Sequence, residues 1–297
     1  MKILFLTPPP LDNAPPAERI FGCNYGIYSQ PNIFILYPAT ILKNAGYEVS
    51  CIDFPVNGKT KHDFEIFCRK KNFDIIFFYT VFLSKRSDLI ARDMLHHQNP
   101  KTRFIYLATE PTASPDDFVD DNSIVIRGEP ESRVLQIVEA LKGQASLKEI
   151  PGISYSESGN KVHTCGNQVM DDLDILPFPD RSLLDSSRYC NPKLSKQPFT
   201  TMLASRGCSF GCYFCVPNSL SFSREIEYKR EFHTGKPPVR LRSARNIIKE
   251  FSLLAMQGYR SISFIDDQFI WNADRTIEIC EGIAPLGVEW SCLARAD

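Results

Sequence analysis

The sequence predicts an α/β protein with two regions, a doubly wound parallel sheet and then a second run of alternating helices and strands. Three observations predict this fold class. Short apolar segments alternate with amphipathic helical segments through the first half of the chain. A similar alternation returns after residue 240. At 297 residues and 43% hydrophobic content, the chain is long enough to bury the cores of two domains.

The first strand is predicted at Lys2–Thr7, an apolar run that ends at consecutive prolines. An irregular segment follows to about residue 32, and "YPATILKNAGYEVSCID" then predicts a helix, a stop at Gly46 and a strand at Glu48–Asp53. The alternation continues with the strands "FDIIFFYTV", "TRFIYLA" and "SIVIRG" and the helices "SKRSDLIARDMLHHQNP" and "EPESRVLQIVEALKG". Strict alternation implies right-handed crossovers and a parallel sheet covered on both faces. Residues 1–145 are therefore predicted to form a flavodoxin-like, Rossmann-type domain.

Sheets of this kind bind ligands at the carboxyl ends of their strands, where the strand order reverses. The loops at that edge are predicted to begin at Pro8, Thr80, Ala108 and Arg127. None of them contains a GxGxxG or Walker sequence, which disfavours dinucleotide and nucleotide binding. The alternative for each loop is that it only closes a turn.

Residues 146–195 are predicted to be a linker. "GISYSESGNKVHT" has the pattern of a hairpin around Ser158, Gly159 and Asn160. "DDLDILPFPDRSLLD" then carries acidic residues and two prolines through an extended crossing to the second region, residues 196–297.

Charge and hydropathy exclude few function classes but favour a cytoplasmic protein. Lys and Arg total 34 against 35 Asp and Glu, so no overall field favours nucleic acid or a membrane surface. No apolar stretch approaches the roughly 20 residues that span a bilayer. The apolar run at the start meets prolines too soon for a signal peptide.

Three of the 10 cysteines lie in "SRGCSFGCYFCVP", directly after the predicted strand Phe199–Gly207. Cys208, Cys212 and Cys215 have the spacing C-x3-C-x2-C, which brings three thiolates to one side of a loop. Four cysteines would complete a structural zinc site or a fully ligated iron–sulfur cluster, whereas three leave one metal position free. The alternative is a zinc site completed by a distant residue such as His233 or Cys292. The isolated cysteines are interpreted as small packing residues: Cys51, Cys68, Cys190, Cys280 and Cys292.

This loop resembles that of the radical S-adenosylmethionine (SAM) enzymes, whose CxxxCxxC sequence follows the first strand of a (β/α) barrel. The resemblance implies a [4Fe-4S] cluster on the three cysteines and SAM on the open iron, cleaved to a 5′-deoxyadenosyl radical. It continues through predicted helices and strands at Ala244–Gln257, Ser261–Ile265, Ala273–Ala284 and Glu289–Leu293. The SAM-binding residues that it implies, all near strand ends or the cysteine loop, are Phe214, Asp266, Asp267 and Arg295. Helix capping for the aspartates, loop packing for Phe214 and a surface position for Arg295 are the alternatives.

The first half narrows the resemblance to the cobalamin-binding class of these enzymes, on "GEPESRVLQIVEAL", then "DLDILPFPDRSLLD", then the cysteine loop. This class implies cobalamin between the sheet edge and the barrel mouth, and methyl transfer to, or rearrangement or cyclisation of, an unactivated carbon of a small molecule. The chain lacks the Asp-x-His-x-x-Gly motif and has Ala108-Thr109 where Gly-Gly is common. The residues that the class places in the cobalamin loops are Thr80, Ser84, Ala108, Thr109, Gly128 and Glu129.

The resemblance also implies partners and leaves alternatives. A flavodoxin or ferredoxin would supply the electron. The chain ends after the third predicted barrel strand, where the family barrel has six, so a fragment or a second chain that completes the barrel is expected. A methylthiotransferase would need Cys23, Cys51 and Cys68 for a second cluster. A non-catalytic module that binds a cluster or zinc is the other alternative. The insert "SLSFSREIEYKREFHTGKPP" is predicted to be a solvated loop.

Overall fold

The computed structural model describes residues 1–22, 29–166, 169–233 and 235–295. Its larger sheet has seven strands in the order β2-β1-β3-β4-β5-β6-β7. The first five pair in parallel and the last two are antiparallel. The order 2-1-3-4-5 is that of a flavodoxin-like sheet, as predicted. The strands are β1 (Lys2–Thr7), β2 (Glu48–Asp53), β3 (Ile75–Tyr79), β4 (Arg103–Leu107), β5 (Ser123–Ile126), β6 (Ile153–Glu157) and β7 (Asn160–His163).

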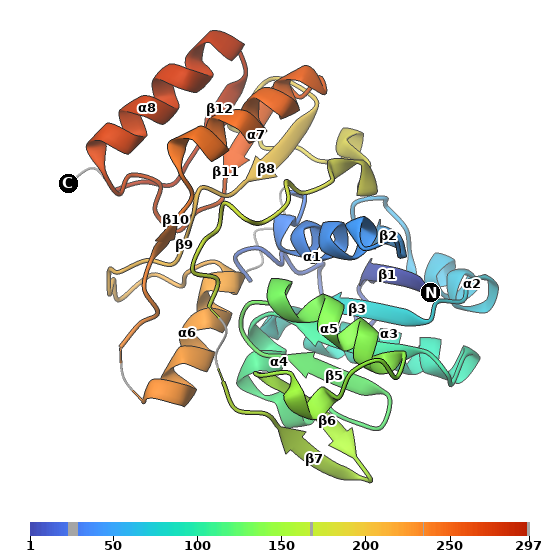
Figure 1. Cartoon of the computed structure of the whole chain (residues 1–297). Helices are drawn as coiled ribbons and strands as arrows, with labels where there is room; N and C mark the ends of the chain where they lie inside the picture. Colours follow the sequence, from blue (N-terminus) through green and yellow to red (C-terminus); the bar gives the residue numbers. More distant parts are fainter. Residues whose placement is uncertain (23–28, 167–168, 234, 296–297) are drawn as a thin grey trace.

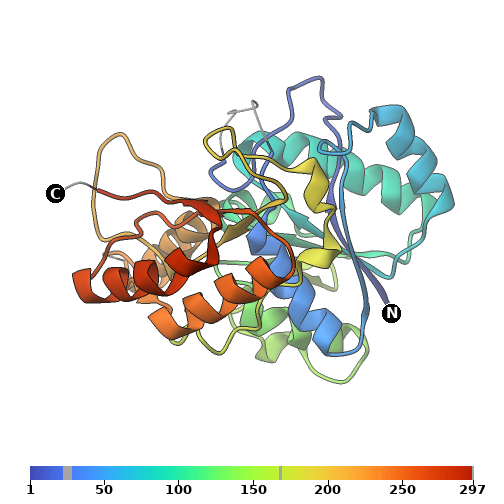
Figure 2. The same cartoon turned by 90° about the horizontal axis from the view of Figure 1, so that it is seen from above.

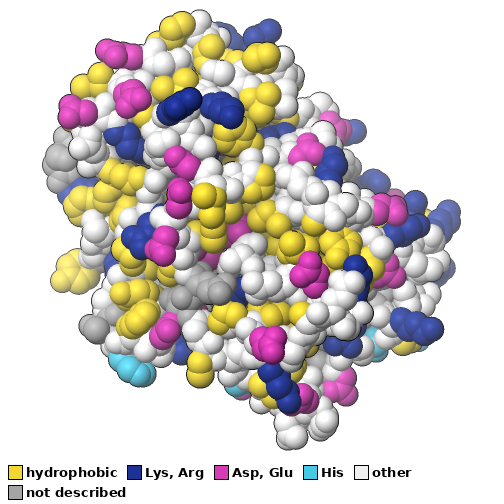
Figure 3. Space-filling model, in the orientation of Figure 1, with side chains coloured by type: hydrophobic (Ala, Val, Ile, Leu, Met, Phe, Trp, Pro, Cys, Tyr) yellow, Lys and Arg dark blue, Asp and Glu magenta, His cyan; other side chains and the backbone are white. Residues whose placement is uncertain are grey.

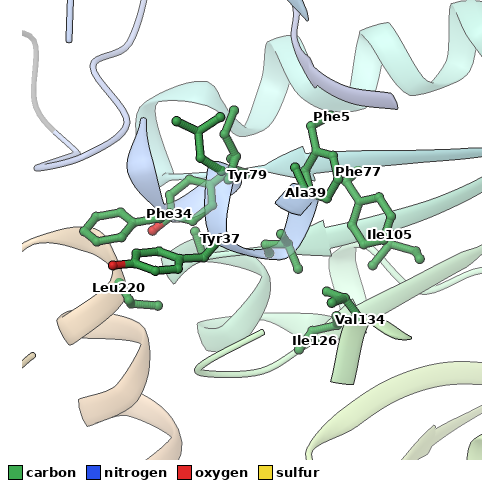
Figure 4. Packing of buried hydrophobic residues seen from close by; sticks show 14 of the residues in the cluster. Phe5, Phe34, Tyr37, Ala39, Phe77, Tyr79, Ile105, Ile126, Val134 and Leu220 are labelled. Atoms are coloured by element: carbon green, nitrogen blue, oxygen red, sulfur yellow. The ribbon is translucent and has the colours of Figure 1, made fainter. Parts of the chain in front are cut away.

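Helices cover both faces of this sheet because its central strands are apolar on both sides. Alternate residues of β1 enter two different cores: Ile3 and Phe5 pack with α1 (Ile33–Asn44) and α5 (Glu131–Leu141). Leu4 and Leu6 pack on the opposite face with α2 (Lys61–Lys70) and α3 (Lys85–Gln98). Phe5 and Phe77 stack with ring centroids 4.4 Å apart in the first of these cores (Figure 4).

The hairpin predicted around Gly159 is confirmed, and it extends the first sheet. Ser158 and Gly159 have φ of +52° and +80°, which a two-residue hairpin turn between twisted strands requires. β6 pairs antiparallel with β5 through Ile124–Tyr155, Val125–Ser154 and Ile126–Ile153. The first part of the predicted linker therefore adds two strands to the Rossmann-type sheet.

The second region contains a three-stranded parallel sheet in the order β12-β11-β8. Its strands are β8 (Phe199–Met202), β11 (Ser261–Phe264) and β12 (Glu289–Ser291). The helices α7 (Ala244–Met256) and α8 (Ala273–Ile283) lie alongside each other on one side of it (Figure 2). Each of these elements begins at its predicted residue, and all but β8 end within two residues of the predicted end. The strand predicted at Phe199–Gly207 ends at Met202, and a separate short strand follows at Ser205–Arg206. The core between them contains Met202, Ile247, Phe251, Phe264 and Ile279.

The expectation of a solvated loop after the cysteines is wrong, because most of that segment is the helix α6 (Ser219–Phe232). Asn218 caps it by accepting a hydrogen bond from the backbone N–H of Ser221. The buried face of the helix carries mainly polar side chains, with Leu220 as its fully buried apolar residue. Figure 1 shows α6 beside the first region and below β9 and β10, and it contacts the short helix α4 (Thr109–Ala113).

The face of the molecule shown in Figure 3 carries charged side chains of both signs. Acidic and basic side chains are interspersed on the face shown in Figure 3, as the net charge of −1 suggests. In the described part of the chain, no helix combines the length and the apolar character that crossing a bilayer needs.

Candidate functional site

The cysteine loop follows β8 and the short strand β9 (Ser205–Arg206), at the carboxyl edge of the three-stranded sheet. Cys208 and Cys212 are partly exposed and Cys215 is exposed. The backbone N–H of Cys215 donates to the carbonyl of Cys212 over 3.2 Å, which folds the end of the loop into a turn. Gly207 enters the loop at φ +91°, a conformation that favours glycine.

The donor set of this loop fits a [4Fe-4S] cluster with one iron left open, since three soft thiolate ligands lie within eight residues. Burial, and then the nearby carboxylate of Asp267, raise the pKa of the Cys215 thiol, and burial also raises that of Cys208. Among the described residues, no three His, Cys, Asp or Glu side chains are gathered tightly enough to hold a metal ion. A cluster on this loop would require the three thiols to lie closer together than they do in this structure.

The two predicted aspartates at the end of β11 have different surroundings. Asp266 is fully buried; its carboxylate accepts hydrogen bonds from the backbone N–H of Ala204 (3.0 Å) and the hydroxyl of Ser205 (2.6 Å). Burial raises its pKa to about 6. Asp267 accepts a hydrogen bond of 2.6 Å from the backbone N–H of Asn218. In addition to burial, its charge contributes to the raised pKa of the Cys208 and Cys215 thiols. Asp266 thus holds the strand before the loop, while Asp267 lies beside the loop.

Arg295 lies on the cysteine loop, as its predicted place on the rim implies. Its Nη1 is 3.6 Å from the Sγ of Cys212, and its guanidinium is 4.1 Å from the ring centroid of Phe210. Phe210 in turn stacks on Trp271 at 6.3 Å. Phe214 is 91% exposed, so its ring faces solvent rather than packing the loop against the sheet.

At the carboxyl edge of the first sheet, Thr80 and Ser84 are buried and engaged within the protein. Both hydroxyls donate to the carboxylate of Asp88, over 2.8 and 3.0 Å. Arg19 closes this group with two hydrogen bonds of 2.8 Å to the same carboxylate and one to the carbonyl of Tyr79. A cavity of about 330 Å³ lies nearby, at the ends of β1 and β2, lined in part by Arg19 and Asp53.

The other predicted cobalamin-loop residues are also at this edge. Ala108 has φ +84° and ψ −161°, a conformation that is normally restricted to glycine. The cobalamin-binding class that the sequence resembles commonly has glycine at this position. Thr109 begins α4. Gly128 has φ +76°, and a Cβ built on it would lie 3.6 Å from the Cβ of Glu227 on α6. Glu129 is buried and paired with arginines of the second region.

Helix α6 contacts the end of β3 and the segments that follow β1, β4 and β5. Ser219 donates its backbone N–H to the carbonyl of Ile20 after β1, and its hydroxyl lies 2.8 Å from that of Tyr79 in β3. Arg230 donates to the carbonyl of Thr112 after β4 (2.7 Å). The remaining contacts are to the loop after β5: Arg127 with Glu227 (3.0 Å) and Arg224 with Glu129 (2.8 Å). Helix α6 therefore covers the part of this edge formed by the ends of β3–β5, whereas the cavity of about 330 Å³ lies at the ends of β1 and β2.

The cysteines of the alternative functions are not brought together. Cys51 packs into the core beneath α1, whereas Cys68 belongs to the core on the opposite face of the sheet. These two cysteines therefore cannot share a cluster, and Cys23 lies outside the described residues. For the zinc alternative, His233 ends α6 with φ +59° and Cys292 follows β12. Burial raises the pKa of Cys292 to about 11.

The sequence analysis did not predict the ion pairs that join the two regions. They are formed by Arg206 and Arg224 with Glu131 and with Glu129, which had been predicted only as a cobalamin-loop residue. All four side chains are at least 99% buried. Their signal was weak but present, because "SRGC" and "GEPES" each place charged residues directly after an apolar strand, where exposure is not expected.

The chain resembles several larger proteins. It is 32% identical to an uncharacterized methyltransferase of Pyrococcus horikoshii over 58% of this chain and 35% of that protein. It is 22% identical to the cytidylyl-2-hydroxyethylphosphonate methyltransferase of Streptomyces wedmorensis over 86% of this chain and 54% of that protein. No family model matches the chain.

Two solved structures share its fold. The cobalamin-dependent SAM radical enzyme OxsB superimposes with a TM-score of 0.65 at 20% identity, over 95% of this chain and 36% of OxsB. The radical SAM methyltransferase TsrM of Kitasatospora setae gives 0.60 at 15% identity, over 96% of this chain and 51% of TsrM. The fold is similar to those of OxsB and TsrM. The chain spans about a third of the length of the Pyrococcus protein and of OxsB, and about half of the length of the Streptomyces protein and of TsrM.

Proposed function

We propose that this chain comprises the Rossmann-type domain and the cluster-binding part of a radical SAM enzyme. The observation that carries the proposal is the placement of three cysteines, and no fourth, on one loop at the carboxyl edge of a parallel sheet whose fold matches radical SAM enzymes. Catalytic residues of (β/α) barrels lie at this edge. The three cysteines would hold the [4Fe-4S] cluster, which when bound supplies the electron that cleaves SAM.

The surrounding residues shape and orient that site. Gly207 lets the chain turn into the loop, and Asp266 fixes the preceding strand through the backbone of Ala204. Asp267 presents a carboxylate beside the loop, where it would attract the amino group of SAM. Arg295 would attract the carboxylate of SAM from the rim. The exposed ring of Phe214 offers an apolar surface for adenine.

The reaction class that we propose is methyl transfer to a small molecule, with a flavodoxin or ferredoxin as reductant in the cytoplasm. Its support is the names of the two relatives, both methyltransferases, and the fold shared with OxsB and TsrM. Cobalamin is the expected methyl carrier of this class, and α6 contacts the loops that were predicted to hold it.

Anaerobic reconstitution with iron and sulfide, followed by metal analysis and a dithionite-driven SAM cleavage assay, tests this function. The expected result is one [4Fe-4S] cluster per chain, with visible absorption that bleaches on reduction, and 5′-deoxyadenosine as a product. Zinc bound without iron would refute the proposal and favour a structural module. A cluster that binds SAM without cleaving it would restrict the function of these residues to cofactor binding.

A further inference from the structure

Two carboxylates of the Rossmann-type domain are buried against two arginines of the second region. Glu129 and Glu131 follow β5, and their side chains are each 1% exposed. Arg206 reaches both, with Nη1 3.2 Å from Glu129 Oε1 and Nη2 2.7 Å from Glu131 Oε1. Arg224 shares Glu129, with its Nε 2.8 Å from the same Oε1. One guanidinium therefore bridges two carboxylates, and one carboxylate oxygen receives two guanidinium groups.

The two arginines stand on either side of the cysteine loop in the sequence. Arg206 ends β9, two residues before Cys208, and Arg224 lies on α6, nine residues after Cys215. Gly207 joins them in space. Its backbone N–H donates to the hydroxyl of Ser221 over 3.1 Å, and a Cβ on it would lie 2.9 Å from Arg224 Nη1. The segments before and after the loop are thus both attached to Glu129, and the segment before it is also attached to Glu131.

Stability alone is a weak reason to keep such a group. Replacing a buried ion pair by apolar side chains of similar volume is often neutral or stabilising, because the desolvation of two charges offsets their attraction. What a bidentate guanidinium provides is direction, since its planar fork fits two acceptors in one geometry. The ring of Tyr37 lies 5.5 Å from the guanidinium of Arg206 and fixes its plane from a third side.

The chain also contains a comparable group that does not touch the cysteine loop. Glu250 on α7 is fully buried between Arg181 (2.5 Å) and Arg242 (2.6 Å). It joins the linker to the second region and resembles the first group in burial, charge and use of arginine. The position of the Arg206 group beside the cysteines is what distinguishes the two.

We propose that Arg206 is a positioning residue, which sets the place and conformation of the cysteine loop through Glu129 and Glu131. The proposal rests on the proposed function only for its effect on a bound cluster. Its effect on the loop itself is present in the metal-free chain.

The test replaces Arg206 by lysine, which keeps the charge but cannot contact both carboxylates with a fixed fork. Glu131→Gln is the second variant, because it weakens one arm and leaves the Arg224–Glu129 pair in place. Glu250→Gln is the matched control. Backbone hydrogen exchange of residues 205–219 is measured in the metal-free chain, and the electron paramagnetic resonance spectrum and midpoint potential are measured after reconstitution.

We expect backbone hydrogen exchange in residues 205–219 to accelerate about tenfold in both variants, and the spectrum of the reconstituted cluster to change. The Glu250→Gln control should be less stable overall but should keep the wild-type exchange of these residues and the wild-type spectrum. Wild-type exchange and spectra in the Arg206 variant would overturn the proposal, as would an equal change in the control. If the wild-type chain takes up no iron, the proposed function fails, whereas the metal-free exchange measurement still decides the role of Arg206.

Discussion

The two parallel sheets of this chain end in carboxyl edges of opposite character. At the edge of the larger sheet, charged side chains are paired with one another and α6 lies across the loops. At the edge of the smaller sheet, the cysteines are partly exposed and Phe214 faces solvent. Topology marks both edges as places for ligands. The difference teaches that topology gives the place, whereas the neighbouring chain segments decide whether the place is open.

The largest effect is expected at the open edge, from Cys212→Ala. Two thiolates cannot retain the cluster, so iron and sulfide after reconstitution should fall to background. The fold should persist, because Cys212 is partly exposed and substitutions of this kind usually change the free energy of unfolding by about 0.5 kcal/mol or less. Cys165→Ala, at an exposed cysteine far along the chain from the loop, is the control. Unchanged iron in the Cys212 variant would exclude this residue as a ligand.

A buried carboxylate beneath the open edge should make stability depend on pH. Burial raises the pKa of Asp266 to about 6, so the folded state binds its proton more tightly than the unfolded state does. The free energy of unfolding should then fall by about 3 kcal/mol as the pH rises from 4 through 6, at about 1.4 kcal/mol per pKa unit.

Asp266→Asn should remove that fall, and urea titrations of the two proteins across this pH range measure the difference. Glu18, Asp53 and Asp267 also have raised pKa values, but they are present in both proteins and cancel. Parallel pH profiles for the wild type and the variant would show that Asp266 does not titrate in this range.

The closed edge should open when α6 is loosened. Replacing Glu227 and Arg230 by alanine removes contacts of α6 with the loops after β4 and β5. The dissociation constant for hydroxocobalamin should fall about tenfold or more, because a larger fraction of the chain would expose the edge. Gel filtration with absorbance detection measures it, and alanine at the exposed Arg245 and Glu281 serves as the control. Tight, stoichiometric binding by the wild type would show that α6 does not obstruct the edge.

The smallest effect concerns strain at the closed edge. Glycine at position 108 should stabilise the fold by about 1 kcal/mol, because Ala108 holds a backbone conformation that costs alanine about 1–3 kcal/mol. Ala140→Gly, inside α5, should instead destabilise by about 1 kcal/mol. Urea unfolding compares the two, and equal signs would argue against strain at Ala108.

The sequence predicted the strands well because their burial follows from apolar composition. β1 and β2 have their predicted bounds, and the hairpin was readable from its turn residues. Helix α6 was not predicted, because its buried face carries Ser, Arg and Glu instead of an apolar stripe. Its partners are side chains far along the chain, such as Arg127 and Glu129, which no local pattern contains.

The site shows the same division. Cysteine spacing and strand ends are local signals, and the structure places Asp267 and Arg295 near the cysteine loop, as these signals predict. Thr80 and Ser84 lie in the predicted loop, but their hydroxyls donate to Asp88 in the first turns of the next helix, and a buried aspartate is not expected from the charged sequence there. The ion pairs of Arg206 depend on how the two regions pack against each other, which cannot be predicted from the local sequence.

The hairpin that extends the larger sheet has a consequence for aggregation. β7 carries Asn160, Lys161 and His163, mostly exposed, whereas β5 is entirely buried and apolar apart from Ser123. Polar and charged edge strands discourage pairing with another molecule. The hairpin thus covers the edge of β5 and places a polar strand at the edge of the sheet. The Rossmann-type domain expressed alone should stay monomeric when it ends after His163, and should aggregate when it ends near residue 145 and leaves β5 at the edge.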